Sequence, residues 1–211
     1  MILMKSISLI ALAFLPLCLF SQGENKMKIK EGKFYSYPEI LILTSQIDGD
    51  NASGYDKFGY QLGLITGIGL KNNKSLSFSM GLSERGSRRL FNPDEPSLNA
   101  FHIRYTSLDL GLLYGAIFNS FHLQGGIRST YLLGITETEN YVPNIGQDYR
   151  KIGLLIDLKA TYPLNDQYFL SATFQYSLLS LLNPTVSQVN YLLGGGGAFH
   201  NVLGLGIVWK P

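Results

Sequence analysis

The chain has 211 residues, the length of a single domain, and a formal net charge of only +2. Charged residues make up 15% of the chain, against about 25% in an ordinary soluble domain, whereas Gly, Tyr and Phe are abundant with 23, 13 and 12 residues. The low charge argues against nucleic-acid binding, which needs a clustered basic face. The composition predicts a β-rich protein whose surface lies partly out of water.

The first 21 residues predict a cleaved signal peptide. Residues 7–20 form an apolar run of signal-peptide length, which is short for a transmembrane helix. Ser21 is small enough to precede the cleavage site, so residues 22–33 are expected to form a short periplasmic segment. An uncleaved anchor and a lipoprotein modified at Cys18 are the alternatives. Because Cys18 is the only cysteine, the mature chain would have neither a disulfide nor a cysteine metal site.

Eight runs of alternating apolar and polar residues follow and predict β-strands. They cover residues 34–47, 57–71, 75–90, 101–118, 121–136, 149–164, 167–182 and 199–210. Three connections are short and contain Asn, which tolerates the backbone conformations of tight hairpins, and the other four are long. Alternating short turns and long loops around an even number of strands are typical of outer-membrane barrels. We therefore predict that residues 34–211 form an all-β, eight-stranded antiparallel up-and-down transmembrane barrel with both termini in the periplasm.

The two faces of most strands differ sharply in polarity. In residues 151–162 the even positions are apolar or aromatic, and the odd positions include Asp157 and Lys159. The facing of residues 34–47 stays open, because that contrast is weak there. A secreted soluble barrel with an apolar interior would show the same alternation. Uncharged apolar faces, polar faces rich in Gly, Ser and Gln, and aromatic residues at strand ends favour the membrane barrel.

The polar faces contain the candidate site residues. Side chains fill the interior of an eight-stranded barrel, and an unpaired charge there is costly. We expect a structural polar network inside the barrel, formed by Arg85, Asp109, Arg128, Asp157 and Lys159. A polar ligand site or a gated pore is the alternative interpretation. Arg85, Arg88 and Arg89 are candidates for a contact with lipopolysaccharide, and the alternative interpretation is a solvated strand end.

No catalytic, metal-binding or cofactor-binding residue is predicted. His102, His122 and His200 are dispersed, and none is followed two positions later by Ser, as in one family of lipid-modifying barrels. The glycines at 194–197 lack the Lys that follows a phosphate-binding loop. The chain is therefore expected not to be an enzyme and to need no cofactor.

Three segments resemble the PorT-like outer-membrane β-barrel family of Bacteroidetes. They are "FSMGLSERGSRR", "YTSLDLGLLYGAIFNSFHLQGGIRSTYLL" and "FHNVLGLGIVWKP". The resemblance implies an eight-stranded up-and-down barrel. The name-giving member of that family is associated with type IX secretion, but that role is not carried over to this chain.

The expected function is that of a structural or interaction protein in the outer membrane of a Gram-negative bacterium. Its partners would be outer-membrane lipid, lipopolysaccharide and envelope or surface proteins, the proteins contacting loops 91–100, 137–148 and 183–198. The alternatives are a small transport or lipid-modifying barrel and a secreted soluble ligand-binding barrel. Lumen conductance distinguishes transport from a sealed interaction barrel.

Overall fold

The computed structural model describes residues 29–48, 54–89, 100–139, 142–143, 148–183 and 198–211. The predicted signal peptide at 1–21 lies outside the described residues, as do most of the segment at 22–33 and of the long loops. No helix within the described ranges is both long enough and apolar enough to cross a bilayer.

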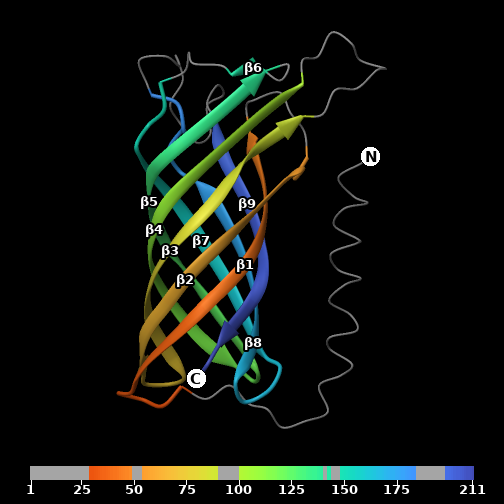
Figure 1. Ribbon diagram of the computed structural model, residues 1–211. Coiled ribbons are helices and arrows are strands. Elements are labelled where there is room, and N and C mark those ends of the chain that lie inside the picture. The colour runs from red at the N-terminus through yellow and green to blue at the C-terminus, as the bar shows by residue number, and fades with distance from the viewer. Residues whose placement is uncertain (1–28, 49–53, 90–99, 140–141, 144–147, 184–197) are drawn as a thin grey trace, which may run out of the picture.

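Eight strands form one closed antiparallel sheet (Figure 1). They are β1 (Phe34–Asp48), β2 (Lys57–Leu70), β3 (Lys74–Arg89), β4 (Phe101–Phe118), β5 (Phe121–Glu139), β7 (Ile152–Pro163), β8 (Tyr168–Ser177) and β9 (Phe199–Trp209). Each strand pairs with its sequence neighbours, and β9 pairs with β1 to close the barrel. A two-residue strand, β6 (Val142–Pro143), pairs with the end of β5 and was not predicted. The predicted eight-stranded up-and-down barrel is confirmed.

The strands β7 and β8 are shorter than predicted at the end of the barrel that carries the long loops. Beyond these ends the pairing between neighbouring segments is irregular, and an isolated bridge joins Tyr149 to Leu182. The Arg150 N–H donates to the carbonyl of Leu181, and the Leu181 N–H donates to the carbonyl of Ala198, both at 2.7 Å. These segments therefore continue the barrel wall at the loop end as irregular structure, and residues 148–151 and 178–183 are called the cap.

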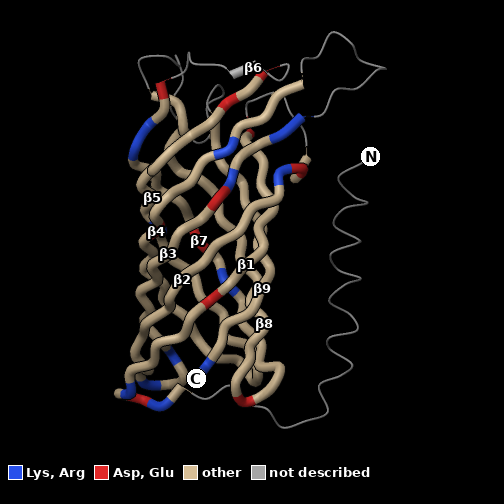
Figure 2. Tube along the Cα trace, in the orientation of Figure 1, with Lys and Arg blue, Asp and Glu red and all other residues tan. Residues whose placement is uncertain are grey.

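The outward positions of most strands are apolar, as the alternation predicts. On β4, every second residue from Leu108 to Phe118 points outward and none is charged; Leu112 is 51% exposed. Charged residues lie mostly toward the two ends of the barrel (Figure 2). The surface therefore has an apolar band between two charged rims.

A β-bulge reverses the alternation in β5. Ser107 pairs with Leu132 but Thr106 pairs with Gly134, so Leu133 is an extra residue in the strand. Arg128 faces inward before the bulge and Glu137 faces inward after it, although one number is even and the other odd. Strict alternation of inward and outward residues along β5 therefore holds only as far as Leu133.

The structure also settles the facing of β1, which the sequence left open. Glu39, Leu41 and Leu43 point inward and are at most 2% exposed, whereas Ile40 and Ile42 are exposed on the outer surface. Both faces of this strand are largely apolar, so the sequence does not show which of its residues point into the barrel.

Two apolar clusters close the interior, one at each end. At the end with the short turns, Ile65, Phe169 and Val208 pack with the stacked rings of Tyr35 and Tyr37. At the loop end lies the outer cap cluster, which consists of Ile47, Ile103, Leu181 and Ala198 packed against Phe101, Ile135, Tyr149 and Leu182. The polar interior therefore lies between two apolar seals.

The short turns use asparagine in the left-handed backbone region. Asn119, between β4 and β5, has φ 53°, and Asn72 and Asn73, between β2 and β3, have φ 58° and 56°. We expect Asn119→Ala to lower the free energy of unfolding by about 1 kcal/mol, because alanine lacks the short polar side chain whose local hydrogen bonds let asparagine adopt the left-handed region. Asn119→Gly is the matched control, since glycine has no such penalty. Urea unfolding of the folded barrel measures both; equal stability of the Ala and Gly variants would contradict the prediction.

Candidate functional site in the barrel interior

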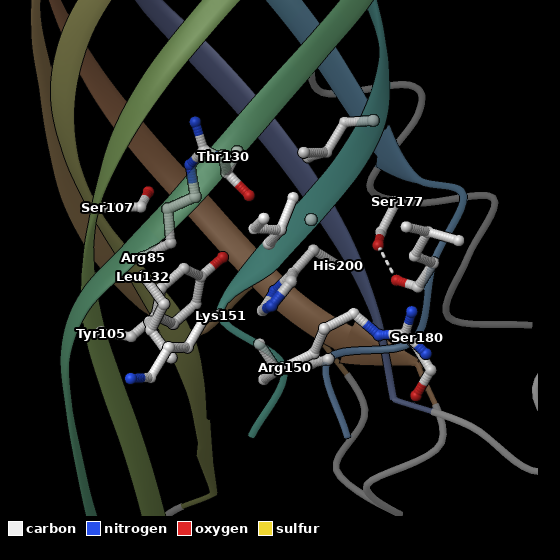
Figure 3. A pocket seen from close by; sticks show the side chains of 15 residues that line it. Arg85, Tyr105, Ser107, Thr130, Leu132, Arg150, Lys151, Ser177, Ser180 and His200 are labelled. Carbon is white, nitrogen blue, oxygen red and sulfur yellow. Dashed lines mark hydrogen bonds between the residues drawn. The ribbon is translucent and has the colours of Figure 1, made fainter. Parts of the chain in front are cut away.

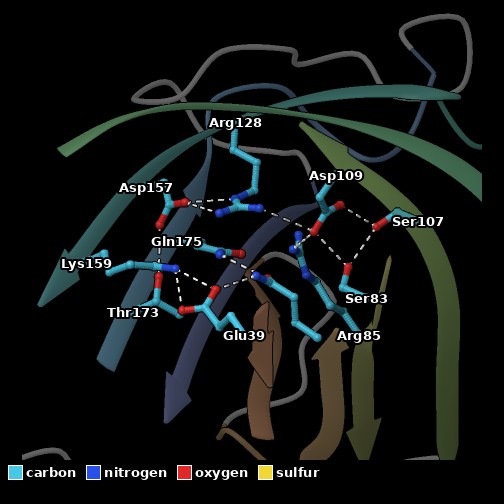
Figure 4. A network of polar contacts seen from close by, with 11 residues as sticks. Glu39, Ser83, Arg85, Ser107, Asp109, Arg128, Asp157, Lys159, Thr173 and Gln175 are labelled. Carbon is cyan, nitrogen blue, oxygen red and sulfur yellow. Dashed lines mark hydrogen bonds and ion pairs between the residues drawn. The ribbon is translucent and has the colours of Figure 1, made fainter. Parts of the chain in front are cut away.

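Arg128 on β5 lies at the centre of the interior network, between two aspartates (Figure 4). Its Nε donates to Oδ2 of Asp157 on β7 at 2.8 Å, and its Nη2 contacts the same carboxylate oxygen. Its Nη1 lies 4.0 Å from Oδ2 of Asp109 on β4. All three side chains have no exposed surface. Arg128 therefore joins two carboxylates that belong to different strands.

Asp109 accepts bonds from three further groups. The guanidinium of Arg85 forms an ion pair with its Oδ2, to which the Ser83 hydroxyl also donates at 2.9 Å. The Ser107 hydroxyl donates to the other oxygen, Oδ1, at 2.8 Å. A buried carboxylate needs several donors to offset the loss of water, and Asp109 has them.

The second half of the network surrounds Glu39 on β1. Lys159 Nζ lies 2.6 Å from both carboxylate oxygens of Glu39, and the Ser171 hydroxyl donates to Oε1 at 2.9 Å. Thr173 donates to Oδ1 of Asp157 at 2.9 Å, which gives this carboxylate a further donor. Sequence reasoning missed Glu39, because the apolar residues on both faces of its strand concealed its direction.

The five residues predicted for this network all point into the interior. Asp109 contacts both Arg85 and Arg128, Asp157 binds Arg128, and Lys159 binds Glu39. Three cations thus face three carboxylates, so the network is neutral once Glu39 is included. The charged groups of the network are buried, and most of their hydrogen-bonding capacity is used in bonds to one another. This arrangement holds neighbouring strands together.

The expected lipopolysaccharide contact is wrong for Arg85. This side chain is 0% exposed and paired with Asp109, because odd-numbered residues of β3 face the interior. Arg88, on the opposite face, is exposed, and the guanidinium carbon of Arg89 lies 5.8 Å from the centroid of the Phe101 ring. Arg88 remains a candidate for an outer-surface contact, whereas Arg89 shares the inward parity of Arg85.

The three histidines lie apart. Nε2 of His122 is 2.7 Å from the Ser75 hydroxyl near the short-turn end, whereas the His200 ring packs on Tyr105 with centroids 4.5 Å apart. His102 is half-buried at the rim where β4 begins. Across the described ranges, no three His, Cys, Asp or Glu side chains are grouped as metal ligands.

Tyr149 ties the cap to β5, because its hydroxyl donates to Oε2 of Glu137. Burial, together with the neighbouring Glu137 carboxylate, raises the pKa of the Tyr149 phenol above its usual value. The stabilising contribution of the protonated phenol is fully present below the unfolded pKa of about 10. It is lost as the pH rises from there through the higher pKa of the folded state.

No family model and no curated protein matches this sequence. Among solved structures, the chain is similar to the attachment invasion locus protein Ail of Yersinia pestis, with a TM-score of 0.48 and 14% identity over 86% of this chain and 100% of that one. Neisserial surface protein A has a TM-score of 0.49 and 14% identity over 84% and 97% of the two chains. For OprG of Pseudomonas aeruginosa the TM-score is 0.42, with 14% identity over 89% and 99%. Likeness at this level says nothing about function.

Proposed function

We propose that this chain spans the outer membrane of a Gram-negative bacterium as a sealed barrel and acts as a structural or interaction protein, without catalysis. The apolar outer band around a charge-neutral interior is the observation that supports this most strongly. Ile127 and Leu112, neighbours on β5 and β4, are 53% and 51% exposed, yet Arg128 and Asp109 on the same two strands are fully buried. Water would penalise such a surface and a bilayer would stabilise it.

A secreted soluble barrel would need the opposite arrangement, with its apolar face lining a ligand cavity. Here the middle of the interior contains the ion-paired network, and large apolar side chains such as Phe78 and Leu158 are about half exposed outside. This orientation supports the membrane protein over the soluble alternative.

In the proposed orientation the short turns lie in the periplasm. The start of β1 and the C-terminus lie at that same end, and the long connections leave from the other (Figure 1). Envelope or surface proteins would bind the loops at 91–100, 137–148 and 183–198, and Arg88 would contact acidic groups of lipopolysaccharide. Membership of the PorT-like family is part of the same proposal and rests on the sequence resemblance.

A sealed interior favours interaction over transport. The stacked tyrosines close the periplasmic end, the outer cap cluster closes the other, and the ion-paired network lies between them. A continuous water path through such an interior would require the ion pairs to separate.

We expect the purified barrel to show no stepwise conductance in planar lipid bilayers. A sixteen-stranded porin inserted into the same bilayers is the positive control. The sample should migrate differently on detergent gels before and after boiling, which checks that it is a folded barrel. Reproducible single-channel steps from a heat-modifiable sample would contradict the sealed lumen and favour the transport alternative. Full solubility without detergent would contradict the membrane location.

A further inference from the structure

A small cavity lies inside the loop end of the barrel, between the polar network and the outer cap cluster (Figure 3). Its lining includes Arg85 from the network and Leu181 from the cap cluster. About 20 Å³ is open to the centres of water-sized atoms, and about 10–15 Å³ is needed to hold one water. The space therefore suits a single small group.

Hydrogen-bonding groups without partners gather around this cavity. In the part of the chain that the structure describes, eight buried side-chain N or O atoms have no hydrogen-bond partner. Five of the eight are Nε and Nη1 of Arg85, Nε of Arg150, and both ring nitrogens of His200. Arg85 is fully buried and His200 is 5% exposed, so bulk water does not satisfy them. Buried donors are normally paired, and this concentration indicates a missing partner.

The charge of the lining has one sign. Arg85, Arg150 and Lys151 are among the fifteen lining residues, which include no Asp or Glu. Asp109 offsets the charge of Arg85 within the neutral network, which leaves Arg150 and Lys151 in excess. Arg150 forms no ion pair with any described residue. Lys151 is exposed, so the cavity lies next to solvent at this residue.

The available groups are mostly donors. An arginine N–H can only donate, and an imidazole retains at least one N–H whichever tautomer it adopts. The Ser180 oxygen already accepts the N–H groups of Leu182 and Ala198, both at 3.2 Å, so its own hydrogen is available to a further acceptor. A water molecule accepts only two hydrogen bonds and does not offset positive charge. An anion accepts more than two hydrogen bonds and also offsets the charge.

We infer that this cavity binds a small inorganic anion, a halide or a compact oxyanion. Arg85, Arg150 and His200 supply the donors. The anion would neutralise the excess charge and join the cap residues at 150–151 and 180–181 to the barrel wall.

The test is the line width of the chloride-35 NMR signal with the folded barrel in non-ionic detergent. Chloride exchanging with a protein site broadens this signal, and a competing anion narrows it again. We expect wild-type protein to broaden the line saturably. Arg150→Gln should bind chloride about tenfold more weakly, because it loses a charged donor. Arg104→Gln is the matched control, since it removes the same charge from the exposed outer surface of β4.

His200→Gln is the second variant, and each variant must keep its heat-modifiable gel shift. Loss of broadening in Arg150→Gln or His200→Gln, with Arg104→Gln unchanged, supports the site. If inorganic phosphate competes with chloride, the site binds oxyanions. If phosphate does not compete, the site is specific for halides. No broadening by the wild type, or equal broadening by all variants, would overturn the inference.

Discussion

Asp109→Asn is expected to lower the free energy of unfolding by about 3–5 kcal/mol, the usual cost of removing one partner from a buried ion pair. The asparagine is almost the same size, so the loss is electrostatic. Arg85 would lose its carboxylate, Arg128 would keep only Asp157, and the interior would carry one uncompensated positive charge. Urea unfolding in lipid vesicles, followed by the fluorescence of the single tryptophan, Trp209, measures the effect.

The double variant Asp109→Asn with Arg85→Met distinguishes charge imbalance from loss of individual bonds. It restores a neutral interior, and buried ion pairs replaced by apolar groups often cost little. We expect it to be less destabilised than the sum of the two single variants, with a coupling of about 0.5–3 kcal/mol. Strictly additive effects would contradict the view that charge balance stabilises the interior.

Leu112→Arg is expected to destabilise the barrel in lipid vesicles by about 2–4 kcal/mol, the cost of arginine near the middle of a bilayer. Leu112 lies in the outward band of β4, between Phe78 on β3 and Ile127 on β5. An arginine there has no carboxylate among these neighbours and must face lipid. Urea unfolding in the same vesicles as for Asp109 measures the change.

Leu164→Arg is the matched control for depth. Leu164 is 42% exposed but lies just beyond β7, in the short turn. The same substitution there should cost at most about 1 kcal/mol, because the interface accommodates a charge. In a soluble barrel both positions would face water, and the two variants would be equally mild. Equal effects would therefore contradict the membrane orientation.

The facing of many residues was predictable from their own strands. Strand backbones alternate their side chains strictly, so the apolar face of β7 identified Asp157 and Lys159 as inward residues before any pairing was known. The prediction that Arg85 contacts the outer surface was wrong. It relied on the cluster of basic residues at the strand end, although the odd position of Arg85 on β3 places it inside. Reasoning from alternation failed for the upper part of β5, because nothing in the sequence marks the bulge at Leu133.

The sequence by itself determined the number of strands, their order and the face that is apolar, because these follow from alternation and turn residues within short segments. Tertiary structure decided which charges meet. Glu39 and Lys159 are 120 residues apart and pair only because the closed barrel brings β1 and β7 to the same level of the interior. The cavity lined by Arg85, Arg150 and His200 arises in the same way, from three segments that become neighbours when the barrel closes. Alternation gives a side chain its direction, whereas strand register and barrel closure give it its partners.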